Sequence, residues 1–276
     1  MKVASLELGD ATLRDQVFAV FPLASLGQAE GVVPQWGLVG YEIFKRFVVK
    51  VDYERSQLTL TLPPAFSYTG EGTVVPFKFS EHIPQVEGEI DDLPGQFDID
   101  TGSRSSLDLL GPFVEKHDLK ARYAPKVEGV TGWGVGGGAR SLVTRAKTLR
   151  LGGVTVAAPV TELSLQKNGA FTDPYVAGNV GAGVLKRFNL TFDYGRQEIV
   201  FEPNANYAKP DVFDRTGLWL NLAAAGFEVM DVIAGGPAAE AGLGVGDRIV
   251  AVDGKPAVAL SLPALSTLHH KYANVY

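Results

Sequence analysis

The amino-acid sequence predicts a mainly β fold, made of two unequal copies of one unit and a further segment at the C-terminal end. Glycine is abundant, with 32 of 276 residues, and the apolar stretches are short and bounded by Gly, Pro, Asp or Asn, which favours many short strands over long helices. The second observation is an internal repeat. A hydrophobic content of 46% and a charged content of 20% are typical of globular proteins with a packed core, and the length allows about two domains.

The repeat joins two stretches that lie far apart in the chain. Residues 37–47, with the sequence GLVGYEIFKRF, recur as residues 178–188, with the sequence GNVGAGVLKRF. The match continues with Asp52-Tyr53 and Asp193-Tyr194 at the same spacing, and upstream, after a small gap, with Leu8-Gly9 and Thr12 against Leu151-Gly152 and Thr155. Self-similarity of this kind indicates two duplicated halves.

Both copies are expected to end in the same local structure. A short helix leads into a two-strand hairpin whose apolar and polar residues alternate, as half-buried strands require. The helix and strands are expected at residues 42–47, 48–53 and 58–62 in the first copy, and at 184–188, 189–194 and 198–201 in the second. Two Pro-containing polar stretches, residues 63–72 and 203–216, are interpreted as linkers.

The copies differ in length, because Met1 aligns near Thr144 and nothing before it corresponds to residues 73–143. Two interpretations are open: the chain is a fragment of a longer precursor, or the first copy has decayed. The fragment is favoured, because the retained half-copy still has clean strand patterns. We therefore expect residues 1–62 to be the C-terminal half of a first lobe and residues 73–203 to be a complete second lobe.

The chemically distinctive stretch is residues 95–103, GQFDIDTGS. Its apolar residues alternate with polar ones, as in a half-buried strand that delivers Asp100 at its end. Gly102 is expected to permit a tight turn because glycine tolerates any backbone angle, and the hydroxyls of Thr101 and Ser103 can hydrogen-bond neighbouring backbone and carboxylate groups. Asp-Thr-Gly alone is a weak signal, since Asp often begins a turn after a strand.

In its order of elements the chain resembles the retropepsin-like aspartic peptidases, in a bacterial variant that carries a PDZ domain. The order is a strand, Asp-Thr-Gly-Ser, a Gly-rich hairpin, further strands, an apolar-apolar-Gly element, a short helix and a closing strand. The resemblance covers residues 1–203. The site residues that it implies are Asp100, Thr101, Gly102 and Ser103 in the catalytic turn, residues 179–181 closing the loop around that turn, and Gly132, Trp133 and Gly134 in a substrate flap at residues 129–140.

The activity implied by this resemblance is hydrolysis of peptide bonds by acid–base catalysis, with neither metal nor cofactor. Two carboxylates share one proton; the ionised one takes a proton from water, while the protonated one polarises the scissile carbonyl. The sequence departs from the family, because it holds no second Asp-Thr-Gly or Asp-Ser-Gly, and Val252-Asp253-Gly254 belongs to a different segment. The chain alone is therefore expected to be inactive until a missing first-lobe segment, or a second copy in a homodimer, supplies the partner of Asp100.

The Gly-rich stretch at residues 129–140 has two interpretations. It is either a plain mobile loop in which Trp133 is a core anchor, or a lid that closes over an extended substrate and excludes water. The lid is favoured, because the position in the family and the glycine hinges agree. A flap that clamps an extended chain adds main-chain hydrogen bonds as an added strand does, so the expected substrate is a peptide or protein.

Residues 216–276 resemble a bacterial PDZ domain that is truncated at its C-terminal end. The resemblance rests on residues 235–243, GGPAAEAGL, and residues 246–256, GDRIVAVDGKP. It implies a carboxylate-binding loop at Ala225, Gly226 and Phe227, a strand at 228–233, a short helix at 237–241 and a groove helix that begins at 263–268. The alternative is a structural appendage that never binds peptide. His269-His270 are expected to be exposed to solvent, because adjacent side chains point in different directions and no third metal ligand is at hand.

Composition argues against several other classes of protein. A net charge of −6 provides no basic surface for nucleic acid, and no apolar run approaches the ~18 residues that a membrane helix needs. Without cysteine there is neither a disulfide nor a thiolate nucleophile.

Localisation stays open, since any export signal would precede Met1 and would make the protein periplasmic or exported. The competing function is a non-catalytic PDZ adaptor that carries a degenerate peptidase lobe.

Overall fold

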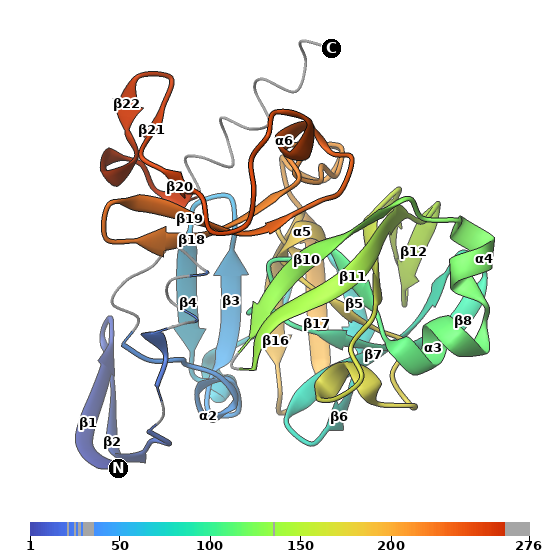
Figure 1. Ribbon diagram of the computed structural model, residues 1–276. Helices are drawn as coiled ribbons and strands as arrows, with labels where there is room; N and C mark the ends of the chain where they lie inside the picture. The colour runs from blue at the N-terminus through green and yellow to red at the C-terminus, as the bar shows by residue number, and fades with distance from the viewer. Residues whose placement is uncertain (21, 25, 27–28, 30–35, 135, 263–276) are drawn as a thin grey trace.

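The computed structural model describes residues 1–20, 22–24, 26, 29, 36–134 and 136–262. Over these residues the chain is mainly β, with short helices between the strands (Figure 1), which confirms the predicted class. A ten-stranded sheet and a five-stranded sheet carry most of the structure, and smaller sheets lie at the two ends of the chain. No helix among the described residues is long and apolar enough to cross a membrane.

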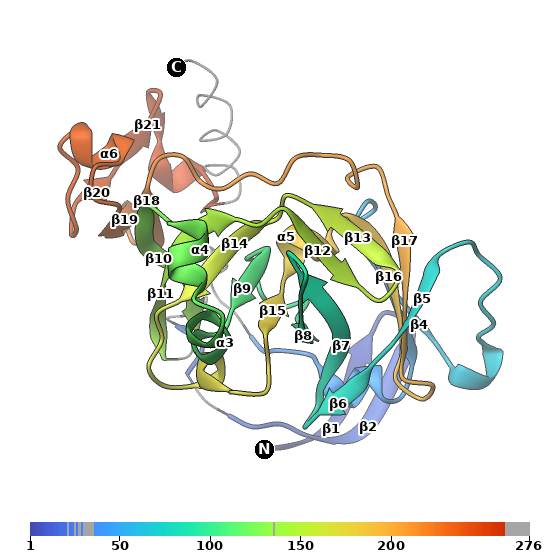
Figure 2. The ribbon, with the colours of Figure 1, turned by 90° about the vertical axis from the view of Figure 1, so that its right-hand side faces the viewer.

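The ten-stranded sheet belongs to the second copy and has the order β10-β11-β14-β9-β15-β8-β7-β12-β13, with β6 paired to β7. Its strands are β6 (Lys78–Ser80), β7 (Ile83–Ile90), β8 (Leu93–Ile99), β9 (Leu107–Leu109), β10 (Val127–Gly134), β11 (Gly137–Arg145), β12 (Thr148–Leu151), β13 (Val154–Ala157), β14 (Val160–Ser164) and β15 (Gly178–Val180). Two of its pairings are parallel, β14 with β9 and β15 with β8. Since parallel neighbours need long connections, segments distant in sequence meet at the centre of this sheet (Figure 2).

The five-stranded sheet joins the two copies. Its order is β4-β3-β16-β17-β5, with β3 (Val48–Asp52) and β4 (Gln57–Thr61) from the first copy and β5 (Thr73–Pro76), β16 (Phe188–Asp193) and β17 (Glu198–Pro203) from the rest of the chain. β3 and β16 are antiparallel, with Lys50 opposite Thr191. Equivalent hairpins of the repeat therefore lie side by side in one sheet.

The two copies also build matching turns. The hairpin of β1 (Lys2–Leu8) and β2 (Ala11–Val17) corresponds to that of β12 and β13, and Gly9 and Gly152 in their turns have φ values of +57° and +56°. After β3 and after β16, Asp52 and Asp193 each accept a backbone N–H of the turn through the side chain and pair with an arginine of that turn. The same short-range chemistry thus forms the turn twice.

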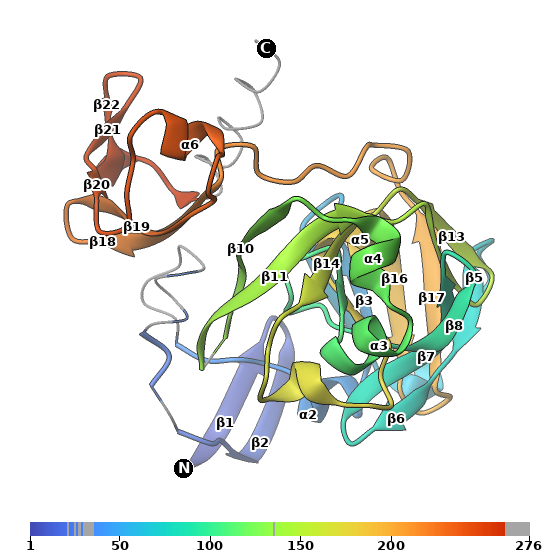
Figure 3. The same cartoon turned by 45° about the vertical axis from the view of Figure 1, so that its right-hand side comes forward.

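The helices are single turns or little more. α2 (Tyr41–Phe44) and α5 (Ala182–Leu185) begin and end earlier than the sequence predicted, because the apolar residue expected to close the second helix, Phe188, already begins β16. α3 (Gly111–Lys116) and α4 (Leu119–Tyr123) lie on one side of the ten-stranded sheet (Figure 3). The described residues also contain short 3-10 turns at η1 (Pro63–Ala65), η2 (Ala170–Thr172) and η3 (Ala257–Ala259).

The stretch expected to be a second linker is fastened to the second copy. Asp211 is only 7% exposed, its carboxylate accepts the backbone N–H of Val160 at 2.8 Å, and it lies 3.9 Å from the guanidinium of Arg187. A composition rich in polar residues and Pro cannot reveal such a contact. Residues 203–216 therefore run along the lobe instead of hanging between two bodies.

The C-terminal part forms a three-stranded sheet in the order β18-β19-β20, with a small β21–β22 hairpin. Its elements are β18 (Leu218–Ala223), β19 (Gly226–Val232), α6 (Pro237–Glu240), β20 (Arg248–Ile249), β21 (Ala251–Val252) and β22 (Lys255–Pro256). The strand and the short helix expected here are present with slightly different ends. The expected groove helix at 263–268 and His269-His270 lie outside the described residues.

Candidate active site

Asp100 directly follows β8, at the centre of the ten-stranded sheet. Its backbone N–H donates to the carbonyl of Val180, the last residue of β15, at 3.0 Å. Phe97 and Ile99 of β8 are 0% and 4% exposed, whereas Asp100 is half-buried. Because alternate side chains of a strand point to opposite faces, the core contacts of Phe97 and Ile99 fix the position from which Asp100 projects.

Two donors hold the Asp100 carboxylate. The backbone N–H of Gly102 donates to Oδ1 at 2.8 Å, and the side-chain amide of Asn179 donates to Oδ2 at 3.4 Å. A Cβ atom on Gly102 would stand 3.2 Å from Oδ1, and the φ of Gly102 is not in the left-handed region. A larger residue here would require the carboxylate to give way by a few tenths of an ångström, and the expected need for an unusual backbone angle is wrong.

The segment after β15 closes around the turn that carries Asp100. The backbone N–H of Ala182 donates to the carbonyl of Ser103 at 2.8 Å, and that of Gly183 to the carbonyl of Ser105 at 3.0 Å. The hydroxyls of Ser103 and Ser105 share a hydrogen bond of 2.8 Å, while Thr101 is exposed. The turn that carries Asp100 is thus fixed by backbone contacts from α5, the short helix that follows β15.

A row of polar side chains crosses the sheet beside Asp100. Asp98 of β8 lies opposite Asn179 of β15, and Asn179 lies opposite Asp108 of β9. Asp108 in turn lies opposite Glu162 of β14. Directly opposite residues share a face of the sheet, and Asp98 shares its face with Asp100 two positions on. Sequence reasoning missed these three acids, although two acids inside the otherwise apolar strands β9 and β14 were a usable signal.

Asp108 and Glu162 form a buried acid pair, each 4% exposed. Burial raises the pKa of Asp108, against hydrogen bonds from Glu162 and Ser105 that favour its ionised form. Burial also raises the pKa of Glu162 well above its usual value, and the negative charge of Asp108 raises it further. We therefore assign the shared proton to Glu162, which donates to the Asp108 carboxylate; the Ser105 hydroxyl donates to Asp108 as well.

The charge of Asp100 reaches a residue of the first copy. Burial raises the pKa of Tyr53 to about 12, and the negative charge of Asp100 is the second cause. Burial likewise raises the pKa of Asp98, with smaller contributions from Asp173 and Asp100, against a hydrogen bond from Gln85. Tyr53, which sequence reasoning noted only as part of the repeat, therefore belongs to the surroundings of the candidate carboxylate.

The stretch expected to be a flap forms a hairpin of β10 and β11, with a register shift between Val130 and Gly132; we call it the flap hairpin. Gly132, Trp133 and Gly134 lie at the tip end of β10, and Trp133 faces Gly138 across the ladder. The indole of Trp133 stacks on that of Trp219 in β18, with ring centroids 6.2 Å apart and an interplanar angle of 19°. Trp133 therefore contacts the C-terminal sheet and is not an anchor of the main core.

The residues expected to form a peptide-binding loop lie at the turn between β18 and β19. Ala225 is in the turn, because Ala223 pairs with Gly226. Gly226 has a φ of +136°, and Phe227 is 0% exposed in the C-terminal core. Two of the three residues thus pack within a strand, and their role as a carboxylate loop stays a prediction.

The hydrogen-bond partners of the Asp100 carboxylate within the described chain are Gly102 and Asn179, neither of which is an acid. Asp98 and Asp108, the acids that lie opposite Asn179 in the sheet, are engaged with Gln85 and with Ser105. In the described part of the chain no group of three or more His, Asp or Glu side chains is arranged to hold a metal ion. Among the residues that the structure describes, no acid therefore hydrogen-bonds to Asp100 to share a proton with it.

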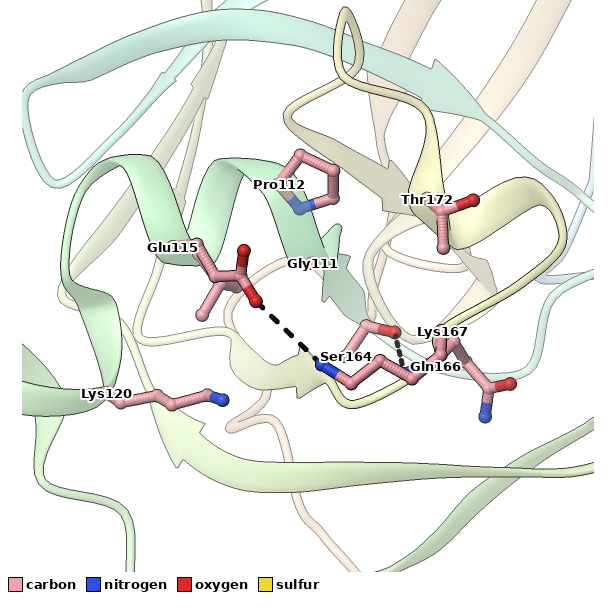
Figure 4. A pocket seen from close by; sticks show the side chains of 9 residues that line it. Gly111, Pro112, Glu115, Lys120, Ser164, Gln166, Lys167 and Thr172 are labelled. Atoms are coloured by element: carbon pink, nitrogen blue, oxygen red, sulfur yellow. Dashed lines mark hydrogen bonds and ion pairs between the residues drawn. The ribbon is translucent and has the colours of Figure 1, made fainter.

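A separate hollow of about 230 Å³ lies between α3 and the chain around residues 164–172 (Figure 4). Its labelled lining residues are Gly111, Pro112, Glu115, Lys120, Ser164, Gln166, Lys167 and Thr172. Glu115 and Lys167 approach to 3.9 Å, but their side chains are 68% and 79% exposed. An exposed ion pair of this kind contributes little, and the hollow does not include the Asp100 turn.

Comparisons with known proteins can be set beside this geometry. The PDZ domain family matches residues 228–268, which confirms the PDZ assignment over those residues. The chain is similar to a retropepsin-like aspartic protease from Rickettsia conorii, with 14% identity, 49% of this chain and 97% of that chain covered, and a TM-score of 0.35. It is also similar to the EIAV protease complexed with the inhibitor HBY-793, with 20% identity, 40% and 90% covered, and a TM-score of 0.28. No curated protein matches the chain.

Proposed function

We propose that this chain is part of an aspartic endopeptidase in which Asp100 is one of two carboxylates that activate a water molecule. The observation that carries the proposal is the placement of Asp100 at the end of a buried strand, half-exposed and held by donors from Gly102 and Asn179. A carboxylate fixed in this way keeps its orientation and stays accessible to water, as a general base requires.

The proposed chemistry needs a second carboxyl group close to Asp100. Two carboxylates a hydrogen bond apart cannot both ionise, so they hold one proton between them. The ionised partner removes a proton from water while the protonated partner donates to the carbonyl oxygen of the peptide. Since one carboxylate cannot fill both roles in one step, the chain by itself is expected to be inactive.

The repeat indicates where the second carboxylate would bind. Residues 178–180 pair with β8, which carries Asp100, and their equivalents are residues 37–39. Within the described chain no strand pairs with residues 37–39, and Trp36 and Leu38 are 90% and 57% exposed. These residues line a hollow of about 500 Å³. A strand equivalent to β8 that packed on residues 37–39 would carry a carboxylate at its end, as β8 carries Asp100. That carboxylate would be the symmetry equivalent of Asp100.

This geometry favours an additional segment over a homodimer as the source of the partner. A second copy of the chain cannot add to β16, because β3 and β17 already occupy both of its edges. Residues 37–39, by contrast, offer an open side. We therefore favour a segment that packs on residues 37–39, supplied by a longer natural form of the protein or by another polypeptide.

The substrate that this arrangement favours is an extended peptide or protein segment. β10 of the flap hairpin is an edge strand whose Val130 N–H is taken by Asp231, so the backbone groups offered to an extended chain are those beyond Val130, towards the hairpin tip, where main-chain hydrogen bonds can form. The PDZ segment adds a second element of a kind that commonly recognises peptides, and we propose peptide binding for it as well.

The decisive experiment compares Asp100→Asn with Asp253→Asn in the longest natural form of the protein, with a mixed peptide library as substrate. Asp253 directly precedes Gly254 and lies in the β21–β22 turn, outside the sheet that carries Asp100, so its variant is the matched control. Cleavage should be abolished by Asp100→Asn at unchanged melting temperature and retained by Asp253→Asn. Cleavage that survives Asp100→Asn would refute the peptidase proposal, and peptide binding without any cleavage would favour the PDZ adaptor.

A further inference from the structure

The C-terminal sheet lies against the flap hairpin, as Figure 2 shows for β18 and β10. β10 is an edge strand of the ten-stranded sheet. The outer backbone groups of an edge strand have no partner within their own sheet. What covers this edge therefore influences where the flap hairpin rests.

Asp231 of β19 binds both strands of the flap hairpin with one carboxylate. Its Oδ2 accepts the backbone N–H of Val130 in β10 at 2.7 Å, and its Oδ1 accepts from the guanidinium of Arg140 in β11 at 2.8 Å. Val130 and Arg140 are cross-strand partners, and the Asp231 side chain is only 14% exposed. Hydrogen bonds to a charged, partly buried acceptor are among the stronger ones in proteins.

Trp219 of β18 touches the flap hairpin and the catalytic turn at once. Trp133, at the tip of β10, stacks on its ring, and the guanidinium of Arg104 lies 5.6 Å from its ring centroid. Arg104 directly follows Asp100-Thr101-Gly102-Ser103 in sequence. The indole N–H of Trp219 donates to Asn221 at 3.0 Å, which fixes the orientation of the ring.

Two further details show that the flap hairpin fits this surface closely. A Cβ atom on Gly129 would stand 2.9 Å from the side chain of Ile233, the residue after β19, so a larger residue at position 129 would force the two segments or that side chain to shift. The indole N–H of Trp133 is buried and has no acceptor among the described residues. Burying an unpaired donor is unfavourable, so the position of Trp133 depends on the compensating stack with Trp219.

From these contacts we propose that Asp231 and Trp219 are positioning residues for the flap hairpin, and that the PDZ segment is thereby part of the substrate-binding machinery. The catalytic consequence rests on the proposed function, whereas the contact itself does not. A flap held in place is already arranged for an extended peptide. Loss of the Asp231 contact should raise KM more than it lowers kcat, because the hydrogen bonds of Asp231 go to the flap hairpin and not to the turn that carries Asp100.

The first test needs no catalysis and uses the chain as it is. Amide hydrogen exchange is measured for residues 127–145 in the wild type, in Asp231→Ala and in Glu128→Gln. Glu128 contacts the same guanidinium of Arg140 at 3.4 Å but belongs to the hairpin itself, so it is the matched control. Asp231→Ala should speed exchange of the Val130 N–H roughly tenfold or more, while Glu128→Gln should leave it unchanged.

A wild-type exchange rate of Val130 in a folded Asp231→Ala protein would overturn the proposal. Unchanged exchange of β16 and β17 establishes that the variant is folded. If Asp231→Ala does not fold, Trp219→Leu in a Trp36→Phe background provides a second measure, because the remaining Trp133 loses its stacked neighbour. Its fluorescence should shift, and an unshifted spectrum would equally count against the proposal.

The second test uses the cleaving form of the protein and separates KM from kcat. Asp231→Ala should raise KM roughly tenfold and change kcat by no more than about twofold, and Asp231→Asn, which still offers an acceptor to Val130, should fall between it and the wild type. Equal kinetic constants in all three would show that the contact does not position the flap. If no form of the protein shows cleavage that depends on Asp100, the proposed function fails. The exchange experiment still tests whether Asp231 holds the flap hairpin.

Discussion

Lys50 lies directly opposite Thr191 in the ladder between β3 and β16, and these two residues occupy equivalent positions of the repeat. The flanking pairs are Val49–Phe192 and Val51–Leu190. In the repeat Val49 is equivalent to Leu190 and Val51 to Phe192, so swapping the two copies turns each of these pairs into the other. Each copy therefore presents the same strand to the other about a local two-fold axis, as in an isologous interface. This symmetry is the reason that the position of Asp100 in one copy implies a definite position for its partner beside the other.

The junction between the copies should be strongly coupled through Phe44 and Phe192. Their rings meet edge to face, with centroids 5.3 Å apart, and Phe192 is 1% exposed. Phe192→Ala should lower the free energy of unfolding by about 3–5 kcal/mol, and a double-mutant cycle with Phe44→Ala, followed by urea unfolding, should give a coupling of about 0.5–1.5 kcal/mol. The equally buried Phe201, paired in a cycle with Phe44→Ala, should give additive losses; equal coupling in both cycles would contradict the direct contact.

The titration of two equivalent tyrosines should report the position of Asp100 without any assay of activity. Burial raises the pKa of both Tyr53 and Tyr194 to about 12, but the second cause is the charge of Asp100 for Tyr53 and Tyr41 for Tyr194. Asp100→Asn should therefore lower the pKa of Tyr53 and leave that of Tyr194 in place. Ring-labelled tyrosine followed by NMR from pH 9 upward compares the pH at which each of the two titrations begins. If the pKa values of both tyrosines shifted equally, or neither shifted, the charge of Asp100 would not act on Tyr53 in particular.

Much of the local structure and the place of Asp100 could be predicted from the sequence, because they depend on neighbouring residues. The alternation around Asp100 fixes a strand end, and the repeated polar turns fix two hairpins. The acid pair of Asp108 and Glu162 could not be predicted, since it depends on β9 and β14 meeting in one register. The contact of Asp231 with Val130 has the same origin. Long-range register is set by packing of the whole sheet, which no local pattern contains.

Asp91 should be a stabilising acid that has no part in the chemistry. It is 7% exposed, and its carboxylate accepts the backbone N–H groups of Lys147 and Thr148, each at 2.8 Å, and the hydroxyl of Tyr123 at 2.9 Å. Asp91→Asn replaces one acceptor oxygen by a donor and should lower the free energy of unfolding by about 1–3 kcal/mol.

The neighbouring Asp92 is the matched control for Asp91. It also has a positive φ, which Asn tolerates, but its side chain is 88% exposed in its contact with Arg150. Asp92→Asn should change stability by no more than about 0.5 kcal/mol. Chemical unfolding of both variants decides the matter, and equal losses would mean that the buried hydrogen bonds of Asp91 contribute nothing.

The buried pair of Glu162 and Asp108 should make the protein less stable as the pH rises. Burial raises the folded-state pKa of Glu162 well above its usual value, so folding favours the protonated acid. The stabilisation is complete below the unfolded-state pKa of about 4 and is lost as the pH rises towards the folded-state pKa, with a slope of at most about 1.4 kcal/mol per pH unit. Asp108, whose pKa burial also raises, acts in the same direction.

Glu162→Gln removes the proton while it keeps an N–H donor for Asp108. Its free energy of unfolding should fall less steeply than that of the wild type between pH 5 and about 7, so the variant gains relative stability as the pH rises. Urea unfolding at several pH values measures the difference. Glu128→Gln, at an exposed position of the flap hairpin, should follow the wild-type profile. Parallel profiles for Glu162→Gln and the wild type would mean that Glu162 is already ionised in the folded protein.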